Sequence, residues 1–131
     1  MPARSNDKVL LSIVELGGYP NFAALYGRLG YSVLVENTMR KAISAIRKHC
    51  PDVIVAEFNY QSDFRDRTSS LETMLAVVQR YPQTRVIVFY EEEYAHQFER
   101  VTSRFPIHAA MKFPVDTDEL QQALESAAGN P

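Results

Sequence analysis

The sequence predicts an α/β protein built on a five-stranded parallel sheet that helices cover on both faces. Five short apolar runs alternate along the chain with five segments in which apolar residues recur at helical spacing. Strands that alternate with helices form parallel sheets, because each right-handed crossover carries its helix back over the sheet. A parallel sheet formed in this way is buried on both faces.

The first two strand and helix units precede Cys50. Residues 8–14 (KVLLSIV) form the first apolar run, and Gly17-Gly18 breaks the pattern after it. Residues 31–36 (YSVLVE) form the second apolar run. A helix is predicted from Pro20 to Gly30, and Asn37 is the predicted N-cap of the next helix. The buried faces of these helices are predicted to carry Phe22, Leu25, Tyr26 and Leu29, and then Met39, Ala42, Ile43 and Ile46.

The stretch from Pro51 to Tyr60 predicts a buried central strand that ends at Glu57. Ligands gather at the carboxyl ends of such strands, so Glu57 is the first candidate site residue. A polar loop follows, and Ser69 with Glu72 has the spacing of a capping box. The third helix is predicted to bury Leu71, Met74, Leu75 and Val78.

Residues 85–90 (RVIVFY) and 108–113 (HAAMKF) predict the last two strands. A helix is expected over residues 91–105, and Asp116 is the expected N-cap of the final helix. The alternation favours a doubly wound (βα)5 sheet of flavodoxin-like strand order. A Rossmann nucleotide fold is less favoured, because no GxGxxG follows the first strand and Gly17-Gly18 is interpreted as a tight turn. The predicted inner faces carry Phe98, Val101 and Phe105, and then Leu120, Ala123, Leu124 and Ala127.

Length and composition indicate one globular domain over residues 8–128, with loose termini at 1–7 and 129–131. The chain has 131 residues, of which 46% are apolar and 23% charged, and a net charge of -2. One cysteine, together with the lack of a signal-like or long apolar segment, predicts a cytoplasmic protein. At this net charge nucleic acid is not expected as a partner. The basic residues of the second helix are better explained as a solvated face: Arg40, Lys41, Arg47 and Lys48.

Four stretches, LGYSVLVEN, KHCPDVIVAEF, RYPQTRVIVFY and MKFPVDTDEL, occur in an order and at separations that resemble the receiver domain of response regulators. The resemblance covers nearly the whole chain. It implies a two-component signalling domain with an acidic pair after the first strand for Mg²⁺ and a phosphate-accepting aspartate ending the third. It also implies a small hydroxyl residue ending the fourth strand and a lysine ending the fifth. Carboxylate oxygens suit a hard cation, and lysine and hydroxyl groups bind phosphate.

The chain departs from this pattern at most of those positions. Glu57 stands where the resemblance places the aspartate, and it is one methylene longer. The acidic pair falls on Ile13 and Val14, so Glu15 is the only acid nearby. The resemblance is therefore to a degenerate receiver, or pseudo-receiver.

At the ends of the last two strands, one residue departs from the receiver pattern and one matches it. Tyr90 replaces the small hydroxyl residue, and it is expected either to fill the space permanently or to be a half-buried tyrosine with its hydroxyl in water. Lys112 matches, although Phe113 separates it from Pro114. We hypothesise a Glu57–Lys112 ion pair that partly imitates a phosphorylated aspartate. The alternative is a solvated strand-end carboxylate with a partner, an interaction that contributes little energy.

An enzyme is not predicted, because no catalytic constellation or cofactor motif is visible. His49, His96 and His108 lack the spacing of metal ligands and are expected at the surface or at strand edges. Cys50 has no positioned base and is expected to be an inert packing residue. Neither a metal nor a cofactor is expected. The alternative to this expectation is a metal held by Glu15 and Glu57.

Two surfaces are expected to contact protein partners. One consists of the fourth helix, the fifth strand and the fifth helix, through which a homodimer is also conceivable. The other is the loop over residues 58–69, where aromatics favour an interface but are equally able to pack onto the fold. The loop residues concerned are Phe58, Tyr60, Phe64, Arg65 and Arg67.

These features together predict a phosphorylation-independent, receiver-like signalling adaptor in a bacterial regulatory pathway, without an output domain. It would act through a protein partner and not through a membrane. The alternative is a divergent response regulator that is still switched by Mg²⁺-dependent phosphorylation, with Glu15 at the metal, or by a ligand. A small metal-dependent enzyme ranks third. The sequence does not identify the partner or the pathway.

Overall fold

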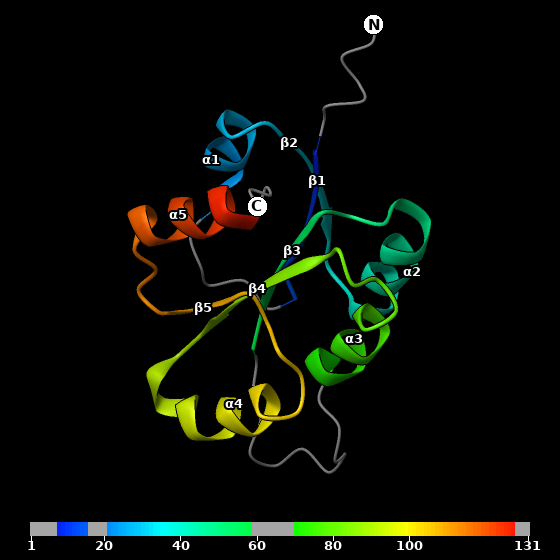
Figure 1. The fold of residues 1–131 in the computed structure, drawn as a ribbon. Helices are drawn as coiled ribbons and strands as arrows, with labels where there is room; N and C mark the ends of the chain where they lie inside the picture. Colours follow the sequence, from blue (N-terminus) through cyan, green and yellow to red (C-terminus); the bar gives the residue numbers. More distant parts are fainter. Residues whose placement is uncertain (1–7, 16–20, 59–69, 128–131) are drawn as a thin grey trace, which may run out of the picture.

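The computed structural model describes residues 8–15, 21–58 and 70–127, and it confirms the predicted doubly wound α/β fold. Five parallel strands form one sheet in the order β2-β1-β3-β4-β5, the flavodoxin-like order (Figure 1). The strands are β1 (Lys8–Ile13), β2 (Tyr31–Glu36), β3 (Val53–Glu57), β4 (Arg85–Tyr90) and β5 (Ala109–Lys112). The helices are α1 (Ala23–Arg28), α2 (Met39–His49), α3 (Ser70–Val78), α4 (Ala95–Thr102) and α5 (Thr117–Ala127), with a 3₁₀ turn at Glu92–Tyr94.

Helices cover both faces of the sheet (Figure 1). Helices α1 and α5 pack on one face, and α2, α3 and α4 pack on the other. Successive residues of β3 alternate between the two cores: Val53 and Val55 face α1 and α5, whereas Ile54 and Ala56 face the other helices. Every residue of β3 is buried, as predicted for the central strand. No helix in the described ranges is both long and apolar enough to span a membrane.

The predicted inner faces of the helices are confirmed by burial. In α3, for example, Leu71, Met74, Leu75 and Val78 are all buried. The predicted capping box of this helix involves Ser69, which lies outside the described residues. Its other member, Glu72, is buried and forms an ion pair with Arg104, so it links α3 to the segment after α4.

Helix ends agree with the predictions at two positions and differ at one. Asp116 Oδ1 accepts the backbone N–H groups of Asp118 and Glu119 and so caps α5. Gly30, after α1, has φ +94°, which favours glycine. The predicted cap Asn37 is wrong by one residue: Thr38 is the N-cap of α2, and its hydroxyl accepts the N–H of Lys41 at 3.2 Å.

Candidate functional site

A cavity of about 260 Å³ lies at the carboxyl ends of β1 and β3. The strand order reverses between these strands, because β2 lies on one side of β1 and β3 lies on the other. In open parallel sheets this reversal is where ligands bind. The sequence predicted that Glu57 would stand at such a site, and the structure places Glu57 in the wall of the cavity.

The floor of the cavity is a row of small and branched side chains on the sheet. Ser12 of β1 lies in register with Val35 of β2 and with Val55 of β3, and all three line the cavity. Val35 is 55% exposed, which is unusual for a valine in a strand that faces a helix layer. Helix α1 therefore leaves this corner of the sheet incompletely covered.

Three aromatic rings form one wall. Phe22, just before α1, meets Phe89 of β4 edge to face, with ring centroids 5.8 Å apart and an interplanar angle of 72°. Tyr26 of α1 lies 6.5 Å from Phe22 and is buried. Burial raises the pKa of the Tyr26 phenol well above its ordinary value, so this wall remains uncharged.

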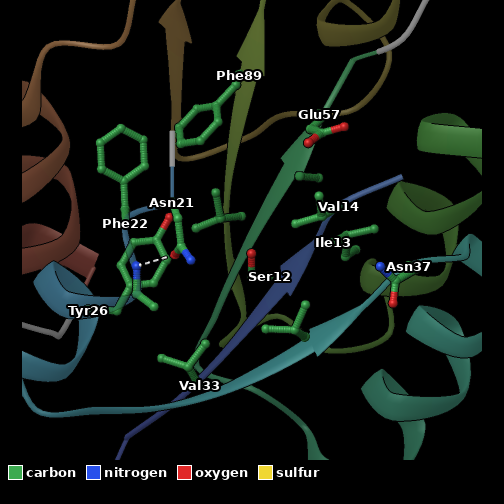
Figure 2. Close-up of a pocket in the computed structure, with 14 residues that line it drawn as sticks. Ser12, Ile13, Val14, Asn21, Phe22, Tyr26, Val33, Asn37, Glu57 and Phe89 are labelled. Atoms are coloured by element: carbon green, nitrogen blue, oxygen red, sulfur yellow. Dashed lines mark hydrogen bonds between the residues drawn. The ribbon is translucent and has the colours of Figure 1, made fainter. Parts of the chain in front are cut away.

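The polar lining groups are distributed over the rest of the cavity. Figure 2 shows Ser12 at the centre, and Glu57 and Asn37 on the side away from Phe22 and Tyr26. Asn21, near the aromatic rings, uses its Oδ1 to accept the N–H of Ala23 at 2.9 Å. Among the described lining residues, Glu57 alone carries a formal charge.

The hypothesis of a Glu57–Lys112 ion pair is wrong. Lys112 Nζ instead lies 2.8 Å from Glu92 Oε1. The hydrogen bond to Glu92, followed by the charge of the same carboxylate, raises the pKa of Lys112. Strand β4 lies between β3 and β5, so Glu57 and Lys112 do not end neighbouring strands, whereas Glu92 lies two residues after the end of β4. The alternative is wrong in expecting a solvated carboxylate, because Glu57 is only 5% exposed.

Tyr90 and Phe58 both pack against α4. The ring of Tyr90 stacks on Phe98, with centroids 4.6 Å apart and planes inclined by 21°. Phe58 is 4% exposed and meets the same ring at 5.2 Å. Of the loop aromatics, Phe58 thus packs onto the fold. The other predicted loop residues lie outside the described part of the chain: Tyr60, Phe64, Arg65 and Arg67.

The end of β1 is mainly apolar. Ile13 is 1% exposed, Val14 and Glu15 are half-buried, and the Val14 N–H donates to Glu36 O at 2.9 Å. Among the described residues no three His, Cys, Asp or Glu side chains lie close enough together to hold a metal ion.

The remaining candidate residues lie away from the cavity. His49 and His96 are exposed, and His108 is half-buried with its Nε2 3.1 Å from Ala123 O. Cys50 was expected to be packed but is exposed, because it is the C-cap of α2 in a left-handed conformation with φ 45°. The basic residues of α2 are exposed, as expected for a solvated face: Arg40, Lys41, Arg47 and Lys48.

Sequence reasoning missed the cavity and the Lys112–Glu92 pair. A signal existed for each. Ser12 interrupts an otherwise apolar strand, and three consecutive glutamates, residues 91–93, follow the end of β4. The register that places Tyr90 beside Lys112 brings the second of these acids within reach of the lysine.

No protein-family model and no curated protein matches the sequence. Solved structures do resemble it. The signal receiver domain of a modulated diguanylate cyclase from Desulfovibrio desulfuricans G20 has a TM-score of 0.68 at 18% identity, over 93% of this chain and 94% of that chain. A response regulator receiver domain protein from Clostridium thermocellum has a TM-score of 0.72 at 17% identity, over 92% of this chain and 94% of that one.

A third similar structure belongs to a family of redox sensors in the streptococci that evolved from two-component response regulators. Its TM-score is 0.71 at 17% identity, over 92% of this chain and 51% of that chain. All three similarities extend over nearly the whole of this chain. The chain therefore has the α/β fold of response regulator receiver domains.

Proposed function

We propose that this chain is a receiver-fold signalling domain that acts through protein contacts and does not transfer a phosphoryl group at the end of β3. The observation that carries this proposal is the arrangement of Glu57 and Lys112. A buried glutamate occupies the end of β3, and the lysine that ends β5 binds Glu92. The carboxylate and the ammonium group are thus not directed at one another, as a shared phosphate would require.

The end of β1 supports the same proposal. A hard divalent cation prefers several oxygen ligands, and Ile13 and Val14 present hydrocarbon where the resemblance places an acidic pair. Tyr90 fills the end of β4 by stacking on Phe98. The streptococcal redox sensors offer a precedent, since they evolved from response regulators and are described as sensing redox state.

Incubation with acetyl phosphate and Mg²⁺, followed by intact-mass measurement, tests the first half of the proposal. The native chain is expected to gain no phosphoryl group. The Glu57→Asp variant is the matched probe: it restores an aspartate, yet it is also expected to remain unmodified, because Lys112 stays bound to Glu92. A phosphoryl adduct on the native chain would contradict the proposal and favour a divergent, phosphorylatable response regulator.

We place the protein contact at the face formed by α4, β5 and α5. Strand β5 is an edge of the sheet, and Phe113, directly after it, is 44% exposed. Exposed aromatic side chains are frequent anchors of protein interfaces. This surface fits either a signalling partner or a second copy of the chain.

The Phe113→Ser variant tests this face, and Val35→Ser is its control. Val35 is also a large exposed apolar residue, but it lies on β2, the opposite edge of the sheet. Sedimentation velocity of the native chain across a concentration series measures dimer formation, and capture from host lysate measures partner binding. The proposal expects Phe113→Ser to abolish the association and Val35→Ser to preserve it. Equal behaviour of the two variants would refute the assignment of this face.

A further inference from the structure

The cavity at the ends of β1 and β3 has an apolar interior of modest size. Phe22 and Phe89 belong to its aromatic wall, and valines of the sheet belong to its floor. Surfaces of this kind, with a few polar groups, are typical of sites for small organic molecules. The volume of about 260 Å³ lies near the lower end of the range for such sites, on the order of 300 Å³. An occupant must therefore be small and largely apolar.

The hydroxyl of Tyr26 is a buried hydrogen-bond donor in the wall of this cavity. The residue lines the cavity and is 3% exposed, and its phenol makes no hydrogen bond within the described residues 8–15, 21–58 and 70–127. Burial of a hydroxyl without a partner costs free energy, so buried tyrosine hydroxyls are usually hydrogen-bonded. Tyr31, which is buried in the same core, follows this rule, since its hydroxyl donates to Leu124 O at 2.9 Å. An acceptor on an occupant would give Tyr26 the kind of partner that Tyr31 already has.

The other polar lining groups favour a neutral occupant. The Oδ1 atom of Asn21 already accepts the N–H of Ala23, and Glu57 already takes part in an interaction within the chain. A charged occupant would therefore lose its hydration without gaining an unused counter-charge among the described lining residues. The Ser12 hydroxyl, which makes no hydrogen bond within the described part of the chain, lies between the aromatic wall and Glu57 in Figure 2. It supplies a second neutral group.

We propose that this cavity binds a small neutral molecule with an apolar ring and one oxygen acceptor, such as an aromatic alcohol or ketone. The ring lies against Phe22 and Phe89, and the oxygen accepts a hydrogen bond from the Tyr26 hydroxyl. This inference goes beyond the proposed signalling function and does not depend on it, because the cavity is filled without a protein partner and without phosphoryl transfer.

Four probes of similar size test the chemical class. Benzyl alcohol is neutral and has an oxygen acceptor, toluene is neutral and lacks one, benzylamine is cationic and benzoate is anionic. Each is titrated into the ¹⁵N-labelled full chain, and amide shifts of the lining residues are followed by NMR. Benzyl alcohol is expected to bind at least about tenfold more tightly than either charged probe, because a charge loses its hydration in an apolar cavity. Equal or tighter binding of a charged probe, or no shifts at the lining residues, would overturn the proposal.

The Tyr26→Phe substitution tests the hydrogen bond, because it keeps the ring and removes the donor. It is expected to weaken the binding of benzyl alcohol about fivefold, as for the loss of one net hydrogen bond, and to leave the binding of toluene unchanged. Its control is Tyr31→Phe, which removes a hydroxyl that is already bonded to Leu124 and that lies outside the described lining. Unchanged affinity for benzyl alcohol in the folded Tyr26→Phe protein would overturn the role of the phenol.

Unfolding in urea without any probe gives a second measurement on the same two variants. Tyr26→Phe is expected to leave the urea midpoint unchanged or to raise it, because the phenol has no partner to lose among the described residues. Tyr31→Phe is expected to lower the midpoint, because it removes a hydrogen bond that is formed. A lower midpoint for Tyr26→Phe would show that its phenol is already bonded and would overturn the proposal.

The Val35→Trp substitution tests the location of the site, because it introduces a large ring at the exposed edge of the cavity. It is expected to weaken both neutral probes, whereas Ser32→Trp, at an exposed position of the same strand outside the described lining, is expected to leave them unchanged. Equal affinities in the two variants would overturn the location. If Tyr26→Phe fails to fold, as judged by circular dichroism, the ranking of the probes and this comparison still decide the question. None of these results bears on whether the chain accepts a phosphoryl group.

Discussion

Tyr31 joins the edge strand β2 to the last helix. Its hydroxyl donates a hydrogen bond to Leu124 O at 2.9 Å, and the residue is only 5% exposed. The Tyr31→Phe substitution keeps the ring and removes the donor, so the carbonyl loses one buried partner. A hydrogen bond of this kind contributes about 1 kcal/mol net. We therefore expect the free energy of unfolding at neutral pH to fall by about 1 kcal/mol.

The same residue makes this difference depend on pH. Burial, and secondly the negative charge of Asp52, raise the pKa of Tyr31 from 10.0 to about 12. The folded state therefore holds the phenolic proton more tightly than the unfolded state. Its contribution to stability is fully present below pH 10.0 and is lost as the pH rises to about 12. Between these two pKa values the free energy of unfolding of the native protein falls by about 1.4 kcal/mol per pH unit relative to the Tyr31→Phe variant. The stability advantage of the native protein should therefore vanish at about pH 11.

Urea unfolding followed by far-ultraviolet circular dichroism, repeated from neutral to alkaline pH on both proteins, measures this difference. Other alkaline groups, including Tyr26 with its raised pKa, are present in both proteins and cancel in the comparison. The two stabilities are expected to converge and then cross. A difference that stays constant through the alkaline range would refute the assigned role of the Tyr31 phenol.

Three further predictions concern single residues. Gly30→Ala should lower the free energy of unfolding by about 1 kcal/mol, because Gly30 has a φ of +94°. Gly27→Ala lies inside α1, where the added methyl group meets no atom within 4 Å outside its own helix and chain neighbours. It should raise the free energy of unfolding by about 0.5–1 kcal/mol in the same urea assay. This prediction would be contradicted if both substitutions changed the free energy of unfolding in the same direction. Asp116→Ala should lower stability by about 1 kcal/mol through loss of the α5 cap, and an unchanged urea midpoint would contradict that role. Glu92→Gln should lower the pKa of Lys112, measured by NMR titration of its side chain; an unchanged pKa would show that Glu92 does not hold the lysine.

Much of the fold could be predicted because each element has a local signal. The bounds of β2 and β4 are those predicted, since these runs are rich in valine, isoleucine and aromatic residues and are flanked by glycine, asparagine, threonine or glutamate. The cap of α2 was misplaced by one residue because Asn37 and Thr38 are both good caps. Only the geometry of the turn decides which side chain reaches the N–H of Lys41.

The candidate site was less predictable because it depends on distances between elements. The sequence indicated that Glu57 ends the central strand, but it did not show that the residue would be buried. The partner of Lys112 is decided by side-chain reach: Glu92 follows the adjacent strand, whereas Glu57 lies one strand further away. The cavity results from how little of the sheet the short helix α1 covers, which no periodicity in the sequence reveals.

Strand β4 connects the cavity to the proposed partner face. Phe89 lines the cavity on one side of the sheet, and the next residue, Tyr90, stacks on Phe98 of α4 on the other side. Successive residues of a strand point to opposite faces, so a shift of the backbone at Phe89 must also move Tyr90. The N–H of Phe58 donates to Phe89 O at 2.9 Å and ties the end of β3 to the same point. A change in the backbone of β4 at the cavity would therefore be transmitted to the proposed partner face through Phe89 and Tyr90.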